Sequence, residues 1–241
     1  MLGLSAGVAI ACIVAVFVGS TVQASVGIGL GMIASPVLAL ADPDFIPATI
    51  VICVVPLSLS IAWTDRHHID GRGFLLAVFG RFPGVVVGAL VAASLTDDVL
   101  AFLVAGSVLT AVAASVSGRH FRPTDPAVVS AGLASGFTGT TTGVGGPPMA
   151  LVYQHSDPAI MRSTIAAYFA VGAGMSVTAL WIAGEVGRRQ LELAAMLLPG
   201  VVLGLATAHF IRSRLDPDAV RPAVLTICAG TSALLLLTTL W

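Results

Sequence analysis

Long apolar runs separated by short polar stretches dominate the chain. The runs fall at residues 3–23, 28–41, 46–64, 74–95, 99–117, 128–140, 147–155, 163–183, 191–211 and 220–240. A helix needs roughly 20 apolar residues to cross a bilayer upright. Three runs, 28–41, 128–140 and 147–155, are shorter than that. The pattern therefore predicts an all-α integral membrane protein. Its short runs are either half-helices of re-entrant hairpins or tilted crossings with one unwound turn.

The chain repeats itself after about 116 residues. The Gly-rich stretch 25–31 returns at 141–147, and a Pro-Gly-x-x-x-Gly pattern at 83–88 returns at 199–204. Because each half holds five runs, an odd number, the second half should be inverted in the membrane. We predict a first membrane repeat over 1–118, a cytoplasmic linker over 119–127, and a second, inverted repeat over 128–241.

Composition excludes most other classes of protein. Of the 241 residues, 57% are hydrophobic and only 10% are charged, whereas soluble domains carry roughly 25% charged residues. No basic run favours nucleic acid. No H-E-x-x-H, P-loop or G-x-S-x-G pattern points to an enzyme or to ATP coupling. The three cysteines lie in separate runs, so neither a disulfide framework nor a metal or cofactor site is predicted.

Arginine predicts how the chain is oriented. With both termini outside, only Arg188 and Arg189 lie in outer loops. The cytoplasmic loops then hold eight arginines, which are Arg66, Arg72, Arg119, Arg122, Arg162, Arg212, Arg214 and Arg221. This asymmetry satisfies the positive-inside rule. We therefore expect a multi-pass protein of the cell inner membrane, surrounded by lipid, with both termini outside.

The paired Gly-rich breaks are the candidate substrate site. Interruptions at equivalent places in two halves of a transporter mark its binding site, because unwound backbone is tolerated at membrane depth only where it lines a cavity or is buried. A helix that starts after a break also points free N–H groups and its dipole at an anion. The candidates are Gln23, Ser25, Gly27, Gly29 and Gly31 in the first half, and Thr140, Thr141, Thr142, Gly143, Gly145, Gly146 and Pro147 in the second.

Two roles compete for glycine in such a chain. Glycine also lets packed helices approach closely, and we favour that role for the many glycines outside the breaks. Pro147 fits the first turn of a helix, where its missing N–H costs nothing.

Two ionisable residues lie inside predicted runs. Arg81 lies about eight residues, or ~12 Å, into the run 74–95. A charge at that depth either pairs with an anionic substrate or extends along its stem to the inner headgroups. His209 either couples protons to transport or packs as a hydrogen-bonded side chain near the inner interface.

A Gly-rich break followed by an apolar, Pro-containing segment, once per half, resembles the TauE/SafE family of sulfite, sulfonate and organosulfur anion transporters. The resemblance covers essentially the whole chain and includes the later Pro-Gly-x-x-x-Gly of each half. It implies a secondary transporter, most simply an exporter, that moves a small sulfur-containing anion by alternating access, with a proton or sodium ion as a candidate coupling ion. The alternatives are an anion channel of the same architecture and a transporter of another small carboxylate anion.

Overall fold

The computed structural model describes residues 3–116, 123–212 and 217–240, without the side chains of 217–221. This part of the chain is all-α and contains no strand. Each apolar run of the sequence forms one helix. The helices are α1 (Ala6–Val26), α2 (Leu30–Ala41), α3 (Ala48–Thr64), α4 (Gly71–Ala92), α5 (Asp97–Val116), α6 (Asp125–Thr142), α7 (Gly146–Tyr153), α8 (Pro158–Ile182), α9 (Arg188–Ile211) and α10 (Pro217–Leu240), with short 3₁₀ turns at Pro43–Phe45 and Arg66–His68.

Seven of the described helices are long and apolar enough to cross a membrane. They are α1, α3 with the turn before it, α4, α5, α8, α9 and α10. The three that are not, α2, α6 and α7, correspond to the three short runs of the sequence. The protein is thus a multi-pass membrane protein, as predicted.

Each Gly-rich break ends one helix and reverses the chain. Gly27 ends α1 with φ of 106°, and Gly143, 116 residues later, ends α6 with φ of 76°. These are left-handed conformations that glycine adopts at little cost. After the turns, Leu30 lies against Gly19 of α1, and Gly145 lies against Gly139 of α6. The short helices α2 and α7 are therefore the second arms of helical hairpins.

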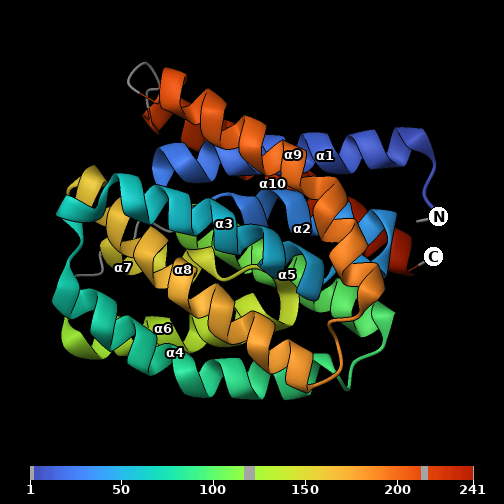
Figure 1. The fold of residues 1–241 in the computed structure, drawn as a ribbon, viewed down its shortest axis with the longest axis horizontal. Coiled ribbons are helices and arrows are strands. Elements are labelled where there is room, and N and C mark those ends of the chain that lie inside the picture. The colour runs from blue at the N-terminus through green and yellow to red at the C-terminus, as the bar shows by residue number, and fades with distance from the viewer. Residues whose placement is uncertain (1–2, 117–122, 213–216, 241) are drawn as a thin grey trace.

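Helices from the two halves of the chain pack in pairs. α1 lies along α9 at the top of Figure 1, α4 lies along α6 at the bottom, and α3 and α8 pack on each other in front of the space between the pairs. Gly84 and Gly88 of α4 contact the backbone of α6, while Gly200 and Gly204 of α9 contact that of α1. The packing role predicted for glycines outside the breaks is confirmed at these four positions.

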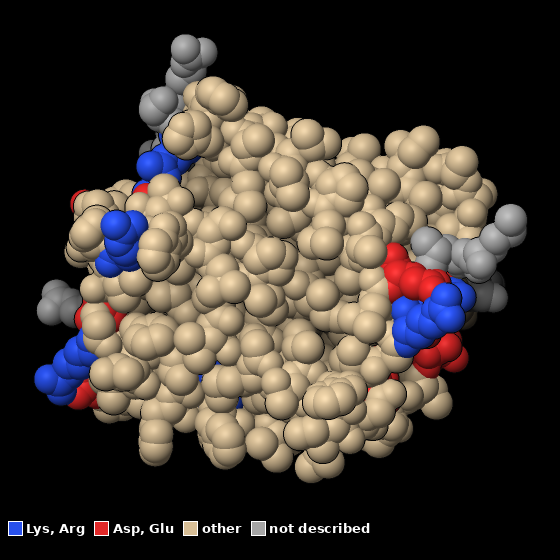
Figure 2. Space-filling view, in the orientation of Figure 1, with Lys and Arg blue, Asp and Glu red and all other residues tan. Residues whose placement is uncertain are grey.

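On the face that Figure 2 displays, most charged side chains gather at the two ends of the molecule. At one end Asp65 pairs with Arg162 and Arg212, and at the other Arg189 pairs with Asp42 and Asp44. Large apolar side chains such as Trp63, Phe79, Ile182 and Phe210 are exposed, as lipid contact requires. Of the predicted cytoplasmic arginines, Arg119, Arg122, Arg214 and the side chain of Arg221 lie outside the described residues.

Candidate functional site

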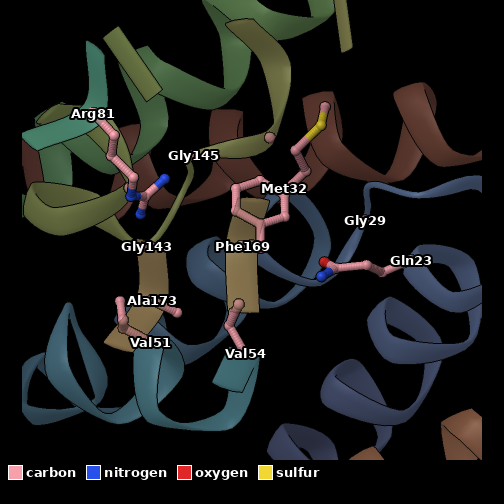
Figure 3. A pocket seen from close by; sticks show the side chains of 13 residues that line it. Gln23, Gly29, Met32, Val51, Val54, Arg81, Gly143, Gly145, Phe169 and Ala173 are labelled. Carbon is pink, nitrogen blue, oxygen red and sulfur yellow. The ribbon is translucent and has the colours of Figure 1, made fainter. Parts of the chain in front are cut away.

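A cavity lies where the two hairpin tips meet in the interior. The backbone of Gly31 contacts the carbonyl group of Gly143 so closely that any side chain at residue 31 would overlap it. Figure 3 shows the side chains that line the cavity, with Gly29 of the first break and Gly143 and Gly145 of the second around it. Its lining residues are Gln23, Gly29, Gly31, Met32, Val51, Val54, Arg81, Gly139, Gly143, Gly145, Gly146, Phe169 and Ala173.

Arg81 projects into this cavity from the middle of α4. Only 2% of the residue is exposed, and its guanidinium lies beside the second break in Figure 3. Nη1 donates to the hydroxyls of Tyr168 at 2.9 Å and Ser135 at 3.3 Å, and Nη2 donates to Ser176 at 3.2 Å. The alternative in which Arg81 extends to the headgroups is wrong, because the side chain is enclosed by α6 and α8.

Aromatic rings and glycines hold the arginine in place. Its guanidinium carbon lies 4.9 Å from the ring centre of Tyr168 and 5.9 Å from that of Phe169, which are cation–π distances. Gly136, Gly139 and Gly172 leave the space through which the side chain passes; a Cβ at Gly172 would overlap the guanidinium.

The guanidinium has no acidic partner among the described residues. All its protein acceptors are neutral hydroxyls, it belongs to none of the ion pairs, and its Nε has no hydrogen-bond partner. Burying an uncompensated charge is costly, so a group of this kind at the wall of a cavity is suited to an anion.

Gln23 contributes the other polar group, from α1. It is 4% exposed. Its Oε1 accepts from the N–H of Leu30 at 3.1 Å, and its Nε2 donates to Ser58 at 3.5 Å. The repeat aligns Gln23 with Gly139, and Arg81 with Leu197. The first half thus supplies both polar side chains of the cavity, an amide from α1 and a guanidinium from α4, and the second half supplies the glycine, Gly139, beside which the guanidinium lies.

Seven of the predicted site residues line the cavity, and six do not. Gln23, Gly29, Gly31, Arg81, Gly143, Gly145 and Gly146 line it. Gly27 lies against Arg162, and Pro147 occupies the first turn of α7. The hydroxyls of Ser25, Thr141 and Thr142 bond to carbonyl groups one turn earlier in their own helices. The hydroxyl of Thr140 hydrogen-bonds to that of Ser176 at 2.7 Å, and Ser176 in turn accepts from Arg81, so Thr140 is linked to Arg81 through the Ser176 hydroxyl.

Sequence reasoning missed the apolar wall and the hydroxyls around Arg81. Met32, Val51, Val54, Phe169 and Ala173 are ordinary members of apolar runs, so no pattern singles them out. Tyr168 carried a usable signal, because it is one of only two tyrosines in the chain and lies inside an apolar run.

The helix N-termini at the breaks offer fewer donors than predicted. The N–H of Leu30, which begins α2, is already bonded to Gln23. α7 begins Gly146-Pro147-Pro148, and proline has no N–H. Arg81 is therefore the stronger candidate for contact with an anion, and the glycine backbone of the breaks is the weaker one.

The remaining ionisable candidates lie elsewhere. His209 is exposed on α9, with its ring edge-on to Phe210, and does not line the cavity. In the described part of the chain, no cluster of three side chains suited to a metal ion is present.

Comparison with known proteins gives one match. A protein-family model described as Sulfite exporter TauE/SafE matches residues 11–235. Neither the curated proteins nor the solved structures contain a match.

Proposed function

Because the family model covers nearly the whole chain, the protein belongs to the sulfite exporter TauE/SafE family, and we propose that it is a secondary transporter, not an enzyme, that exports a small sulfur-containing anion through the cavity between the two breaks.

The buried guanidinium of Arg81 carries this proposal. A charged side chain inside a membrane protein is expensive and marks a functional site by default. Structural ion pairs satisfy such charges with a carboxylate, yet Arg81, which lines the cavity, meets only hydroxyls, and its Nε has no hydrogen-bond partner. An anion that enters the cavity would supply the missing negative charge.

The hairpins suggest how access alternates. The first break approaches Arg162, which together with Asp65 and Arg212 forms an ion-pair group, the Asp65 cluster, at one end of the molecule. The second break approaches Ile50 in the first turn of α3, close to the other end. Two inverted repeats rocking about these tips would open the cavity first to one side and then to the other. A proton or sodium ion is the candidate coupling ion, and the cell inner membrane is the proposed location.

The test is anion binding and flux with the purified protein. Sulfite, thiosulfate, taurine, sulfoacetate and acetate are offered to the detergent-solubilised protein in calorimetry, and to proteoliposomes in efflux assays. We expect saturable binding and saturable efflux of at least one sulfur anion, and loss of both in Arg81→Gln. Efflux that never saturates would identify an anion channel, and a preference for acetate would identify a carboxylate transporter. Wild-type affinity in a folded Arg81→Gln protein would remove the cavity from the site.

A further inference from the structure

The cavity contains a single full charge. Among the described residues that line it, Arg81 is the only ionisable side chain, and Gln23 is the only other lining residue with a polar side chain. The described acidic groups that take part in ion pairs are engaged with arginines other than Arg81. Among the described residues, no second cation lines the cavity to share a ligand of higher charge.

Backbone dipoles add little to this single charge. Each break joins the C-terminal end of one helix, which is partly negative, to the N-terminal end of the next, which is partly positive. The two partial charges lie close together and largely cancel. Leu30 N–H is already bonded, and the two prolines of α7 remove two more donors.

We infer, on the basis of the proposed function, that the site selects its anion by charge and binds it as a monoanion. One guanidinium and one monoanion form a neutral buried pair. A dianion would leave one uncompensated negative charge in a low-dielectric interior, which is strongly unfavourable. The ligand class is a singly charged oxyanion headgroup, such as hydrogensulfite or a sulfonate, and the sulfite dianion is excluded.

The shape of the cavity supports the same class. The guanidinium lies at one side, with its Nε unpartnered. The wall includes Val51, Val54, Phe169 and Ala173, which have no polar side-chain atoms. A headgroup that bonds to Arg81 would thus turn its sulfur lone pair or a short carbon substituent toward apolar side chains. A second charged oxygen has no described cationic partner on that side.

Two anions of similar size but different charge at alkaline pH can test whether the site selects by charge or by shape. Methanesulfonate keeps one negative charge at every accessible pH, whereas hydrogensulfite loses its proton near neutral pH and becomes the dianion. Their dissociation constants are measured by calorimetry on the full-length protein, under nitrogen, from weakly acidic to weakly alkaline pH. The readout is the dissociation constant of the sulfur acid divided by that of methanesulfonate.

We expect that ratio to rise by about tenfold per pH unit above the second ionisation of the sulfur acid, the limit for a ligand that binds in one protonation state. A protein group that titrates in this range changes both constants alike and cancels in the ratio. A ratio independent of pH, or one that falls, would overturn selection for a monoanion while leaving the proposed function intact. Failure of wild-type protein to bind either anion, or any anion of the earlier screen, would overturn the proposed function and this inference with it.

Discussion

Arg81 occupies in the first half of the chain the position that Leu197 occupies in the second. Both side chains are buried, and only one of them is charged. The sequence identified Arg81 as a candidate through this break in symmetry, but its depth alone suited either the lipid headgroups or an anion. The direction of the Arg81 side chain is set by the space that Gly136 and Gly172 leave on the neighbouring helices α6 and α8. No local pattern around residue 81 contains that information.

The guanidinium shape of Arg81 is predicted to matter as well as its charge. Its two terminal nitrogens donate to Tyr168, Ser135 and Ser176 at once. An ammonium lacks the planar fork and cannot meet these acceptors and a ligand together. Arg81→Lys should therefore bind the anion about tenfold or more weakly, and Arg81→Gln should lose binding, as measured by calorimetry. Equal affinity in wild type and Arg81→Lys would contradict the role of the fork.

Gly172 is predicted to position Arg81. A methyl group at this residue would overlap the guanidinium, whereas Gly174, two residues later on the same helix, has nothing within 4 Å of the place of a Cβ. We expect Gly172→Ala to weaken anion binding by at least about tenfold, because the displaced guanidinium no longer holds the position from which it can bond to the anion. Gly174→Ala is the matched control and should bind as wild type. Equal affinities in the two variants would show that the guanidinium does not need this space.

At the scale of elements, helix existence was predictable and helix direction was not. Every apolar run of the sequence forms a helix in the described structure. Whether the short runs cross the membrane or fold back was open, because length permits both. The reversal depends on the left-handed Gly27 and Gly143 and on the contacts that α2 and α7 make with the helices before them. Those contacts are tertiary, so periodicity does not show them.

The second break should not tolerate a large side chain. A Cβ at Gly145 would lie 3.0 Å from the carbonyl oxygen of Ser135 and 3.2 Å from Gly139. Gly145→Leu should abolish transport in proteoliposomes, since the added atoms either fill the cavity or displace the hairpin tip, and Gly29→Leu should do the same at the first break. Gly230→Leu, at an exposed position with open space around it, is the control for insertion and should transport normally. Normal transport by a well-inserted Gly145→Leu protein would exclude the second break from the pathway.

The Asp65 cluster is predicted to stabilise the packing of α3, α8 and α9 at one end of the molecule. Asp65 follows α3 and accepts from Arg162 of α8 at 2.8 Å and from Arg212, at the end of α9, at 3.3 Å. Burial raises the pKa of its carboxyl, but the hydrogen bonds and charges of the two arginines outweigh burial and lower the pKa below its usual range. A lowered pKa stabilises the fold above the carboxyl's ordinary pKa, and this stabilisation disappears as the pH falls through the lowered value.

Asp65→Asn should therefore cost on the order of 3 kcal/mol at neutral pH, the usual range for breaking a buried ion pair. The loss should shrink in strongly acidic solution, where wild-type Asp65 is itself neutral. Thermal unfolding in detergent at both pH values measures the difference. Glu192→Gln, which breaks a pair on the exposed surface of α9, serves as the control and should have little effect at either pH. A loss for Asp65→Asn that did not change with pH would contradict the ionic origin.

For the whole molecule, both the inverted repeat and the sidedness stay predictions. His67 and Asp98 are both exposed and lie at opposite ends of α4. A membrane-impermeant maleimide should label Asp98→Cys in intact cells and should label His67→Cys only after permeabilisation. The native cysteines, Cys12, Cys53 and Cys228, are buried, so the unmutated protein provides the background. Labelling of His67→Cys in intact cells would reverse the assignment.

The solitary charge of Arg81 also has an electrical consequence. In the proposed transporter, a bound monoanion would neutralise the charge of Arg81, so the voltage across the membrane would exert no net force on the loaded step. The empty core keeps one positive charge, and an inside-negative voltage pulls it toward the cytoplasmic-facing state. That pull is worth up to ~2.3 kcal/mol per 100 mV if the charge senses the whole field. In an exporter, this force would speed the return of the empty protein to the cytoplasmic-facing state, so the resting membrane voltage would drive the transport cycle. Net efflux of the anion would then need no second ion.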